Sequence, residues 1–330
     1  MGASGNVGAA VVRRLVEDGH QVRVLLRRSS STRGIDGLDI ERCYGDIFDA
    51  DAVAAAMTDR DVVYYCVVDT RAHLADPAPL LRTNVEGLRG VLDIAVTKNL
   101  HRFVFLSTIG TIAVSRNGTP VDETTPFNWQ GRGGPYIESR RQAEDLVLRC
   151  AAERGLPAVA MCVSNPYGPP DWQPKQGAMV ALAAFGTMPC YIRGVGSEVV
   201  GIDDAALAMV AAGERGRPGE RYIVSERYMS QREMFTVAAA AVGARAPRAG
   251  IPMALVYFAA AIAGASNRLF RTDLPINLVA ARLIALTSPA DHGKASRELD
   301  WHPEPTSESL RRAARCYVDR RGRGEKVIDL

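Results

Sequence analysis

Lysine is scarce in this 330-residue chain, where Lys98, Lys175, Lys294 and Lys326 are the only examples and arginine carries most of the positive charge. Basic and acidic side chains nearly cancel, 40 against 37, which argues against an electrostatic nucleic-acid binder. The most apolar stretch, residues 251–265, is shorter than the roughly 20 residues that a membrane-spanning helix needs. We expect no nucleic-acid partner and no integral membrane span.

Two interpretations of residues 251–265, IPMALVYFAAAIAGA, remain open. A helix of this composition is expected either in a protein core or as a lid lying on a membrane surface.

Patterns typical of disulfide and metal sites are also missing. The six cysteines include no C-x-x-C pair, and the five histidines show no metal-ligand spacing. Cysteines in apolar runs such as YYCVV are interpreted as reduced and buried. No signal peptide precedes the first motif. We expect a cytoplasmic protein without a metal.

Strand-like and helix-like segments alternate up to about residue 165. The expected strands are 20–27, 40–45, 61–68, 102–108 and 157–163, and the expected helices are 8–19, 51–59, 78–99 and 135–155. Alternation of this kind implies crossover units and a parallel sheet with helices on both faces. Because residues 61–68 are almost all apolar, we expect that strand to be buried on both sides. The predicted fold class is α/β, a doubly wound parallel (Rossmann) sheet.

The chain opens with a glycine-rich turn, MGASGNVGAA, that runs into a helix-like segment. Its G-x-x-G-x-x-G spacing allows a tight turn, close approach of the backbone to a pyrophosphate, and close packing of helix and strand. The helix N-terminus that follows favours a phosphate. A merely flexible N-terminus is the alternative. We predict cofactor contacts at Gly2, Ser4, Gly5, Asn6 and Val7.

Arg27 and Arg28 end the next expected strand. A carboxylate there would bind the ribose 2′-hydroxyl of NAD, whereas an arginine accommodates the 2′-phosphate of NADP, and guanidinium donors fit phosphate well. NADP is therefore favoured over NAD, with Arg27 as the first contact and Arg28 as the second. Two solvated arginines are the alternative.

Further cofactor contacts are expected where later strands end, because ligands bind at that edge of open α/β sheets. Asp46, near the adenine amino group, and Ile47 follow one strand, and Cys66, Val67 and Val68 follow the next.

Four hydroxyl-bearing or charged residues come next along the chain. Ser107 and Thr108 end a buried strand at the same edge. Tyr136 and Arg140 are four residues apart at the start of a helix, which places them on one face about 6 Å apart along the axis.

The alternation stops after NPYGPPDWQP. We assign residues 1–165 to an NADP-binding domain, to which some later segments return, and residues 166–330 mainly to a smaller substrate lobe with C-terminal helices. The lobe has no obvious carboxylate or phosphate clamp, which suits a bulky neutral ring-like substrate. Six apolar side chains of the lobe are candidates to line the substrate pocket, and the alternative is that they are core residues. They are Trp172, Phe185, Met188, Tyr191, Tyr257 and Phe258.

The ordered motifs resemble those of extended short-chain dehydrogenases/reductases, particularly the branches of dihydroflavonol 4-reductase, 3β-hydroxysteroid dehydrogenase and hopanoid-associated epimerase-like proteins. They cover nearly the whole chain, and their order is more specific than any one of them. The matching segments are GASGNVG, VRVLLR, GDIFD, TNVEGLRGVLDIA, FVFLST, YIESRRQAE, NPYGPPD, GIDDAALAMVAAGERGRPGERYIVS and GKASRELDWHPEP.

The resemblance implies catalytic roles. Tyr136 matches the tyrosine that acts as acid or base at the substrate oxygen, and Thr108, or Ser107 if the register slips by one, matches the hydroxyl that bonds the same oxygen. Arg140 stands where the family has a lysine, which contacts the nicotinamide ribose and lowers the tyrosine pKa. Since tyrosine titrates near 10 and guanidinium cannot relay a proton, we expect a working but slower enzyme.

Two more cofactor-site residues follow from the resemblance. Asn84 matches a recurrent asparagine that is partly structural and in some members part of a proton relay. Val163 stands where relatives often have a proline near the nicotinamide.

The resemblance also bears on the start of the chain and on assembly. Relatives have a strand in the middle of the sheet before the glycine turn, so we expect the first strand to be truncated here and the natural chain to begin upstream. Many relatives form homodimers through the helices corresponding to residues 79–97 and 136–154.

The predicted function is NADP-dependent reduction of a ketone, or oxidation of a secondary alcohol, on a bulky apolar ring substrate. The alternatives are an NAD-dependent nucleotide-sugar epimerase or dehydratase, and a catalytically weak NADP-binding regulatory protein.

Overall fold

A four-stranded parallel sheet forms the centre of the molecule. The computed structural model describes residues 1–71, 76–115, 117–172, 177–270 and 278–328. The sheet order is β3-β4-β5-β9, and β5 is buried over its whole length. The strands are β3 (Val62–Tyr65), β4 (Arg102–Thr108), β5 (Ala158–Val163) and β9 (Arg221–Val224).

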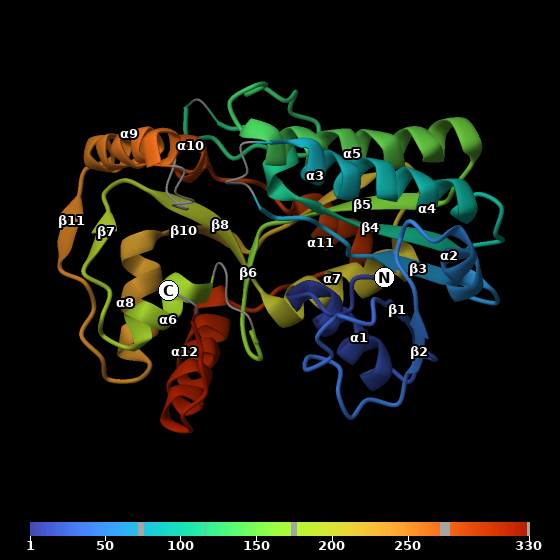
Figure 1. Ribbon diagram of the computed structural model, residues 1–330, viewed down its shortest axis with the longest axis horizontal. Coiled ribbons are helices and arrows are strands. Elements are labelled where there is room, and N and C mark those ends of the chain that lie inside the picture. The colour runs from blue at the N-terminus through green and yellow to red at the C-terminus, as the bar shows by residue number, and fades with distance from the viewer. Residues whose placement is uncertain (72–75, 116, 173–176, 271–277, 329–330) are drawn as a thin grey trace.

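Helices cover both faces of this sheet (Figure 1). On one face α2 (Ala50–Met57), α4 (Leu88–Ala95) and α5 (Gly134–Arg154) share a buried apolar cluster with β3, β4 and β5. On the other, α1 (Asn6–Glu17) and α7 (Ile202–Arg215) share a second cluster with the same strands. The predicted doubly wound Rossmann fold is confirmed.

The expected helix at 78–99 is divided. It consists of α3 (Ala78–Leu81), a π-helical segment η1 (Arg82–Gly87) and α4. A π-helical turn often marks a functional site, and here it contains Asn84.

The sheet is split beside β3. β1 (Arg23–Leu26) and β2 (Glu41–Tyr44) form a separate parallel pair, and among the described residues β1 pairs only with β2, and β3 only with β4. A cleft of about 440 Å³ lies between the two sheets and is lined by residues of β1, β3, α1 and α7.

Met1 lies at the end of this cleft. Its amine donates to the Tyr64 carbonyl at 2.9 Å, and its carbonyl accepts from the Cys66 amide at 3.0 Å. This is the hydrogen-bond pattern of a parallel strand beside β3. Val62 and Tyr64 are only partly buried and line the cleft. The strand expected at residues 61–68 thus has helices on both faces, as predicted, but the face that carries Val62 and Tyr64 is only partly buried.

The lobe contains two smaller sheets with helices packed against them. β6 (Asn165–Tyr167), β8 (Gly196–Gly201) and β10 (Arg227–Ser230) form one sheet, and β7 (Cys190–Ile192) pairs with β11 (Ala249–Ile251). A third apolar cluster joins α6 (Gly177–Ala184), α8 (Gln231–Ala240) and α12 (Thr306–Gly322). The remaining helices are α9 (Met253–Phe270), α10 (Leu278–Ala285) and α11 (Gly293–Leu299).

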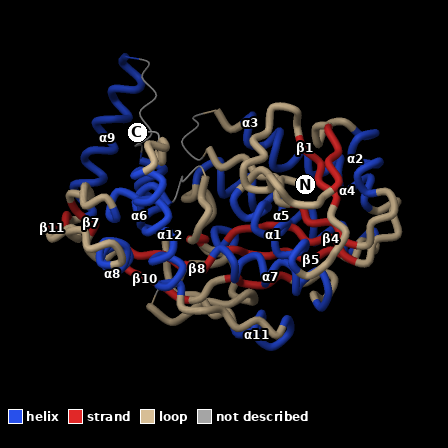
Figure 2. Tube along the Cα trace, turned by 90° about the horizontal axis from the view of Figure 1, so that it is seen from below, coloured by secondary structure: helices blue, strands red, loops and turns tan. Residues whose placement is uncertain are grey.

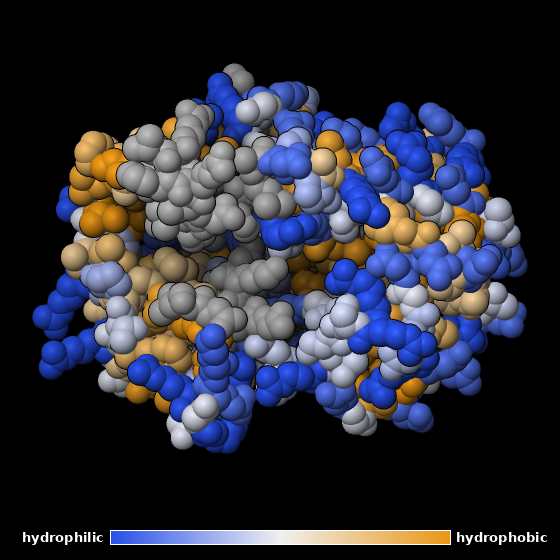
Figure 3. Space-filling model, in the orientation of Figure 1, coloured by the Kyte–Doolittle hydropathy of each residue, from blue (hydrophilic) through white to orange (hydrophobic). Residues whose placement is uncertain are grey.

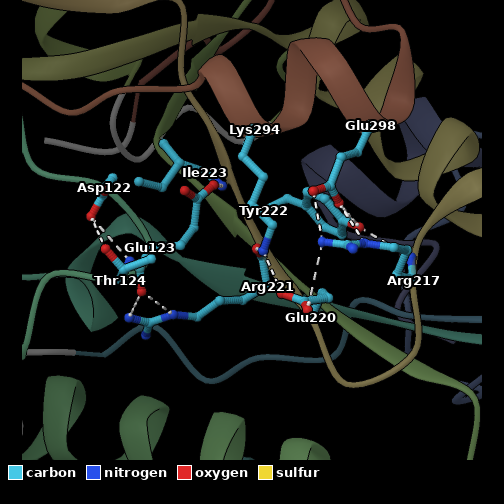
Figure 4. Close-up of polar contacts among 10 residues, drawn as sticks. All are labelled: Asp122, Glu123, Thr124, Arg217, Glu220, Arg221, Tyr222, Ile223, Lys294 and Glu298. Carbon is cyan, nitrogen blue, oxygen red and sulfur yellow. Dashed lines mark hydrogen bonds and ion pairs between the residues drawn. The ribbon is translucent and has the colours of Figure 1, made fainter.

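Late segments of the chain return to the central sheet. Figure 4 shows Lys294 and Glu298 of α11 reaching onto β9. The Lys294 amine donates to the Glu220 carboxylate at 2.6 Å and to the Arg221 carbonyl at 2.9 Å. The Tyr222 hydroxyl donates to Glu298 at 2.8 Å. These contacts fix α11 against β9, an edge strand of the central sheet.

Helix α9 corresponds to the apolar stretch at 251–265, and much of it is exposed. Leu255, Phe258 and Ile262 are 54%, 65% and 56% exposed. The buried-helix interpretation is therefore wrong for these side chains. Within the described residues no helix is long and apolar enough to cross a bilayer.

Candidate active site

The residues predicted for the site gather at one edge of the sheet, where the parallel strands end. The glycine turn precedes α1, Arg27 and Arg28 follow β1, and Asp46 and Ile47 follow β2. Cys66, Val67 and Val68 follow β3, Thr108 ends β4, and Val163 ends β5. Tyr136 and Arg140 lie in the first two turns of α5. Thr108 and Val163 are partners in the parallel register of β4 and β5.

The glycine turn is shaped for close approach of the backbone. Gly2 has φ of 83°, a region that L side chains rarely adopt. A Cβ at Gly2 would lie 2.5 Å from the Cys66 carbonyl carbon, and one at Gly8 would lie 2.2 Å from the Gly2 oxygen. Gly5 caps α1 without a side-chain hydrogen bond. The turn thus presents the N-terminus of α1 without side chains in the way, which fits a pyrophosphate.

The next strand ends place polar groups beside the turn. Arg27 and Arg28 are exposed, and the Arg28 guanidinium lies 5.3 Å from the centroid of the Tyr44 ring. Asp46 is partly buried and accepts the Phe48 amide at 3.2 Å. Both arginines remain accessible to a phosphate.

Asn84 has its polar groups engaged with the protein. Its Oδ1 accepts the Asp69 amide at 2.8 Å, and its Nδ2 donates to the Asp69 carbonyl at 3.1 Å and to Ser139 Oγ at 3.0 Å. Asn84 therefore fixes the segment after β3 against α5.

The two candidate hydroxyls on β4 have different surroundings. Ser107 is buried and donates to the Glu144 carboxylate. The Thr108 side chain instead accepts the Gly110 amide at 3.2 Å and lies near the Tyr136 hydroxyl, whose pKa it lowers. This geometry favours Thr108 over Ser107 as the partner of Tyr136.

The pKa of Tyr136 is raised above its usual value. Burial is the largest cause, and the positive charge of Arg140 and the hydrogen bond with Thr108 offset part of the rise. The phenol is therefore protonated at neutral pH. This suits an acid that gives a proton to a substrate oxygen better than a base that removes one.

Arg140 is 1% exposed. Its Nη2 donates to the Leu106 carbonyl, and its guanidinium carbon lies 5.0 Å from the centroid of the Phe105 ring. Burial lowers the pKa of Arg140, while Tyr136 and Tyr65 oppose that shift. Within the part of the chain that the structure describes, Nε and Nη1 are buried without a hydrogen-bond partner. Unpaired buried donors are costly.

A buried carboxylate, Glu144, lies next to the candidate site, and no pattern in the sequence indicates its contacts. Glu144, one turn beyond Arg140 on α5, accepts hydrogen bonds from Ser107, from Thr111 at 2.8 Å and from the Cys162 thiol at 3.3 Å. Its other oxygen is 3.0 Å from Arg221 Nη1. Glu144 therefore ties β4, β5 and β9 to α5, the helix that carries Tyr136.

Replacing Glu144 with alanine should destabilise the protein by about 3 kcal/mol, because breaking a buried ion pair leaves its partner unpaired. For a chain of this size we expect a fall in Tm of roughly 5–10 °C. Calorimetry or thermal melts would measure it. Asp145, exposed on the same helix, provides the matched control: Asp145→Ala should leave Tm nearly unchanged. Equal effects of the two variants would contradict the role given to Glu144.

Comparison with known proteins decides the family. The model of the NAD dependent epimerase/dehydratase family matches residues 1–225. The chain belongs to this family.

Relatives within the epimerase/dehydratase family include several kinds of enzyme. Sterol demethylase protein B of Methylococcus capsulatus is 27% identical over 325 residues, 97% of each chain. A putative dihydroflavonol 4-reductase of Synechocystis is 30% identical over 257 residues, 76% of this chain and 74% of the relative. The crystal structure of gox2253 superposes with a TM-score of 0.85 at 30% identity, covering 98% of both chains.

Membership confirms the resemblance to extended short-chain dehydrogenases/reductases that the sequence motifs indicated. The chain is an NAD(P)-dependent enzyme of that type, in the oxidoreductase class. A dTDP-glucose 4,6-dehydratase from Streptomyces venezuelae with bound NAD superposes with a TM-score of 0.75 at 23% identity. At that identity the likeness supports the fold alone.

Proposed function

We propose that this enzyme uses NADP to reduce a ketone, or to oxidise the corresponding secondary alcohol, on a bulky and largely apolar ring compound. The observation that carries the proposal is the arrangement around Tyr136. Its hydroxyl lies near the Thr108 side chain and the buried Arg140 cation, both of which lower its pKa, and among the described residues Nε and Nη1 of Arg140 have no hydrogen-bond partner.

In the reduction direction, Tyr136 gives its proton to the carbonyl oxygen as that oxygen gains negative charge. Thr108 donates a hydrogen bond to the same oxygen, and the Arg140 charge stabilises the phenolate that remains. NADPH, when bound, supplies the hydride to the carbonyl carbon. The raised pKa of Tyr136 keeps the acid form, which the reduction step requires, available at neutral pH.

The preference for NADP rests on the end of β1. Arg27 and Arg28 stand there, and the first acidic residue that follows is Asp36. A carboxylate selective for the free 2′-hydroxyl of NAD is therefore replaced by two exposed guanidinium groups. These supply forked donors to a 2′-phosphate.

The substrate class is inferred from the lobe and from the names of relatives. Sterol and dihydroflavonol, which name two of them, are ring compounds. Phe185 and Tyr191 of this chain are partly buried against the lobe core. Met188 is a core residue and Phe258 is 65% exposed, so these two are set aside as substrate contacts.

Fluorescence titration tests the cofactor assignment. We expect NADPH to bind more tightly than NADH, and Arg27→Ala to weaken NADPH at least tenfold, because a charge-assisted hydrogen bond is lost. NADH binding should change little. Arg14→Ala, which removes an exposed arginine paired with Asp18 at 2.8 Å, is the matched control. Tighter binding of NADH, or NAD retained through purification, would favour a nucleotide-sugar enzyme instead.

A further inference from the structure

Glu198 is a buried carboxyl group on β8, the middle strand of the three-stranded lobe sheet, and is 3% exposed. Figures 1 and 2 show β8 between β10 and the strands of the central sheet. One carboxylate oxygen accepts a hydrogen bond from the hydroxyl of Ser225, which follows β9, and the other accepts the Ala290 amide at 3.0 Å. Glu198 therefore joins two segments that are distant from it in the sequence.

No cation pairs with this carboxyl within the described part of the chain. Burial raises the pKa of Glu198 from its ordinary 4.5 to about 7, and the nearby Glu226 adds to the rise. Because the folded pKa is the higher one, ionisation of Glu198 lowers stability as the pH rises through this window, and the loss is complete above it. What Glu198 contributes at neutral pH is therefore its two hydrogen bonds.

Residues 287–291, which include Ala290, connect α10 to α11 and form a strap. Thr287 Oγ1 donates to the Gly196 carbonyl of β8 at 2.8 Å, so this bond and the one to Glu198 hold the strap on the lobe sheet. On its other side the strap pairs with Val121, whose amide donates to a strap carbonyl at 3.0 Å and whose carbonyl accepts a strap amide at 2.8 Å. The strap is therefore bonded to two parts of the molecule at once.

The second of these parts is the segment that follows Thr108 at the end of β4. The Ala290 side chain packs against a small apolar cluster that contains Ile112 and Val121, as does Ile109, which comes directly after Thr108. One strap residue thus gives its amide to the lobe sheet and its side chain to the neighbours of Thr108.

The strap also follows α10, which lies against the start of the helix that carries Tyr136. Gly134 has φ of 67°, and a Cβ there would lie 2.4 Å from Val279 Cγ1 of α10. Figure 3 shows the visible face hollowed between the lobe and the part built on the central sheet. The strap and α10 join these two parts.

We propose that Glu198 is a positioning residue: by holding the strap on β8, it sets the position of the lobe relative to Thr108 and Tyr136. A ketone bound against the lobe must meet both hydroxyl groups at once, and a small displacement of either costs rate or affinity. The inference rests on the proposed function for its consequence in catalysis, but the positioning itself can be measured without substrate.

Hydrogen exchange of the full chain, without cofactor or substrate, tests the positioning. Glu198→Met keeps an unbranched side chain of similar length but leaves the Ala290 amide and the Ser225 hydroxyl without this acceptor. We expect exchange in peptides that contain Val121 or Ala290 to become at least tenfold faster, because the strap opens locally.

Glu198→Gln is the conservative variant and should keep exchange within about twofold of the original. Its amide oxygen still accepts from Ala290. Its NH₂ can donate to the Ser225 hydroxyl, which has a second acceptor in the Val199 carbonyl at 3.2 Å. Rescue by glutamine but not by methionine would show that the hydrogen bonds, rather than the filled volume, hold the strap.

Asp204→Leu is the matched control. Asp204 is 5% exposed and accepts the Glu304 amide at 3.2 Å, as Glu198 accepts that of Ala290, but it lies on α7. This variant should lower Tm without changing exchange at Val121.

Steady-state kinetics give a second readout. Glu198→Met should raise the KM for ketone at least tenfold and leave the affinity for NADPH unchanged, because the proposed cofactor contacts lie outside the lobe sheet. If the unaltered protein reduces no ketone, the proposed function fails, whereas the exchange results still decide the role of Glu198.

Unchanged exchange at Val121 in Glu198→Met, or equal acceleration by Asp204→Leu, would overturn the proposal. If Glu198→Met does not fold, Thr287→Val takes its place, since it removes the other strap bond to β8 and keeps the side-chain shape. It should accelerate exchange at Val121 about threefold, and no acceleration would show that the bonds between strap and lobe position nothing.

Discussion

Tyr136→Phe should lower kcat for ketone reduction by about 10²–10⁴, the range typical of a lost general acid, while NADPH binds as before. The ring remains in place, so packing is preserved. Only the hydroxyl, whose pKa Thr108 and Arg140 lower, is removed. Stopped-flow or steady-state assays on a panel of steroid and cyclic ketones would measure the loss, and fluorescence titration would measure cofactor affinity.

Thr108 provides the control for that experiment. Thr108→Ser keeps a hydroxyl at the end of β4 and should retain most of the activity, whereas Thr108→Ala should lose at least tenfold. A Tyr136→Phe enzyme with more than a tenth of the original kcat would show that the proton comes from elsewhere. If the unaltered protein binds NADPH but turns over no ketone, and Arg140→Lys gives no gain, a regulatory NADP-binding role is favoured.

Extending the chain before Met1 by four strand-forming residues, such as Val-Ile-Val-Val, should raise Tm by roughly 5–10 °C. The cleft between β1 and β3 has apolar walls, which include Val11, Leu15, Val24 and Val63. Burial of four apolar side chains there outweighs the entropy of ordering them by about 2–4 kcal/mol. Thermal melts at matched protein concentration would test the prediction.

The N-terminal amine adds to the expected gain. Burial lowers the pKa of the Met1 amine, so an ammonium is costly to hold there at neutral pH. An extension moves that charge away and continues the parallel pairing that Met1 begins beside β3. A Ser-Gly-Ser-Gly extension of equal length is the control, since it moves the charge but buries little. If both extensions give the same Tm, filling of the cleft contributes nothing.

The central fold could be predicted because its strands are dictated by local pattern. Residues 102–108 and 157–163 are apolar runs between helices, and β4 and β5 match them to within one residue. The turn at Gly2, Gly5 and Gly8 can be predicted for a similar reason, because the spacing of its three glycines falls within eight residues of the sequence. Such features depend on neighbours in the sequence.

Other features depend on residues that are distant along the chain. Glu144 receives hydrogen bonds from three other segments and an ion pair from Arg221, and no spacing in the sequence indicates that convergence. The exposure of Phe258 likewise depends on which elements pack against α9. The composition of an apolar helix does not decide whether a given side chain is buried. The unpaired edges of β1 and β3 that face each other across the cleft also depend on tertiary arrangement, because the sequence of a strand does not show which strands pair with it.

Arg140 has a consequence for how this protein can be handled. Amine-directed dyes, cross-linkers and surface-coupling chemistries would attack a lysine at this position, but a guanidinium has no nucleophilic amine to acylate. All four lysines lie outside α5. The enzyme can therefore be labelled or immobilised through amines while the cation beside Tyr136 stays unmodified.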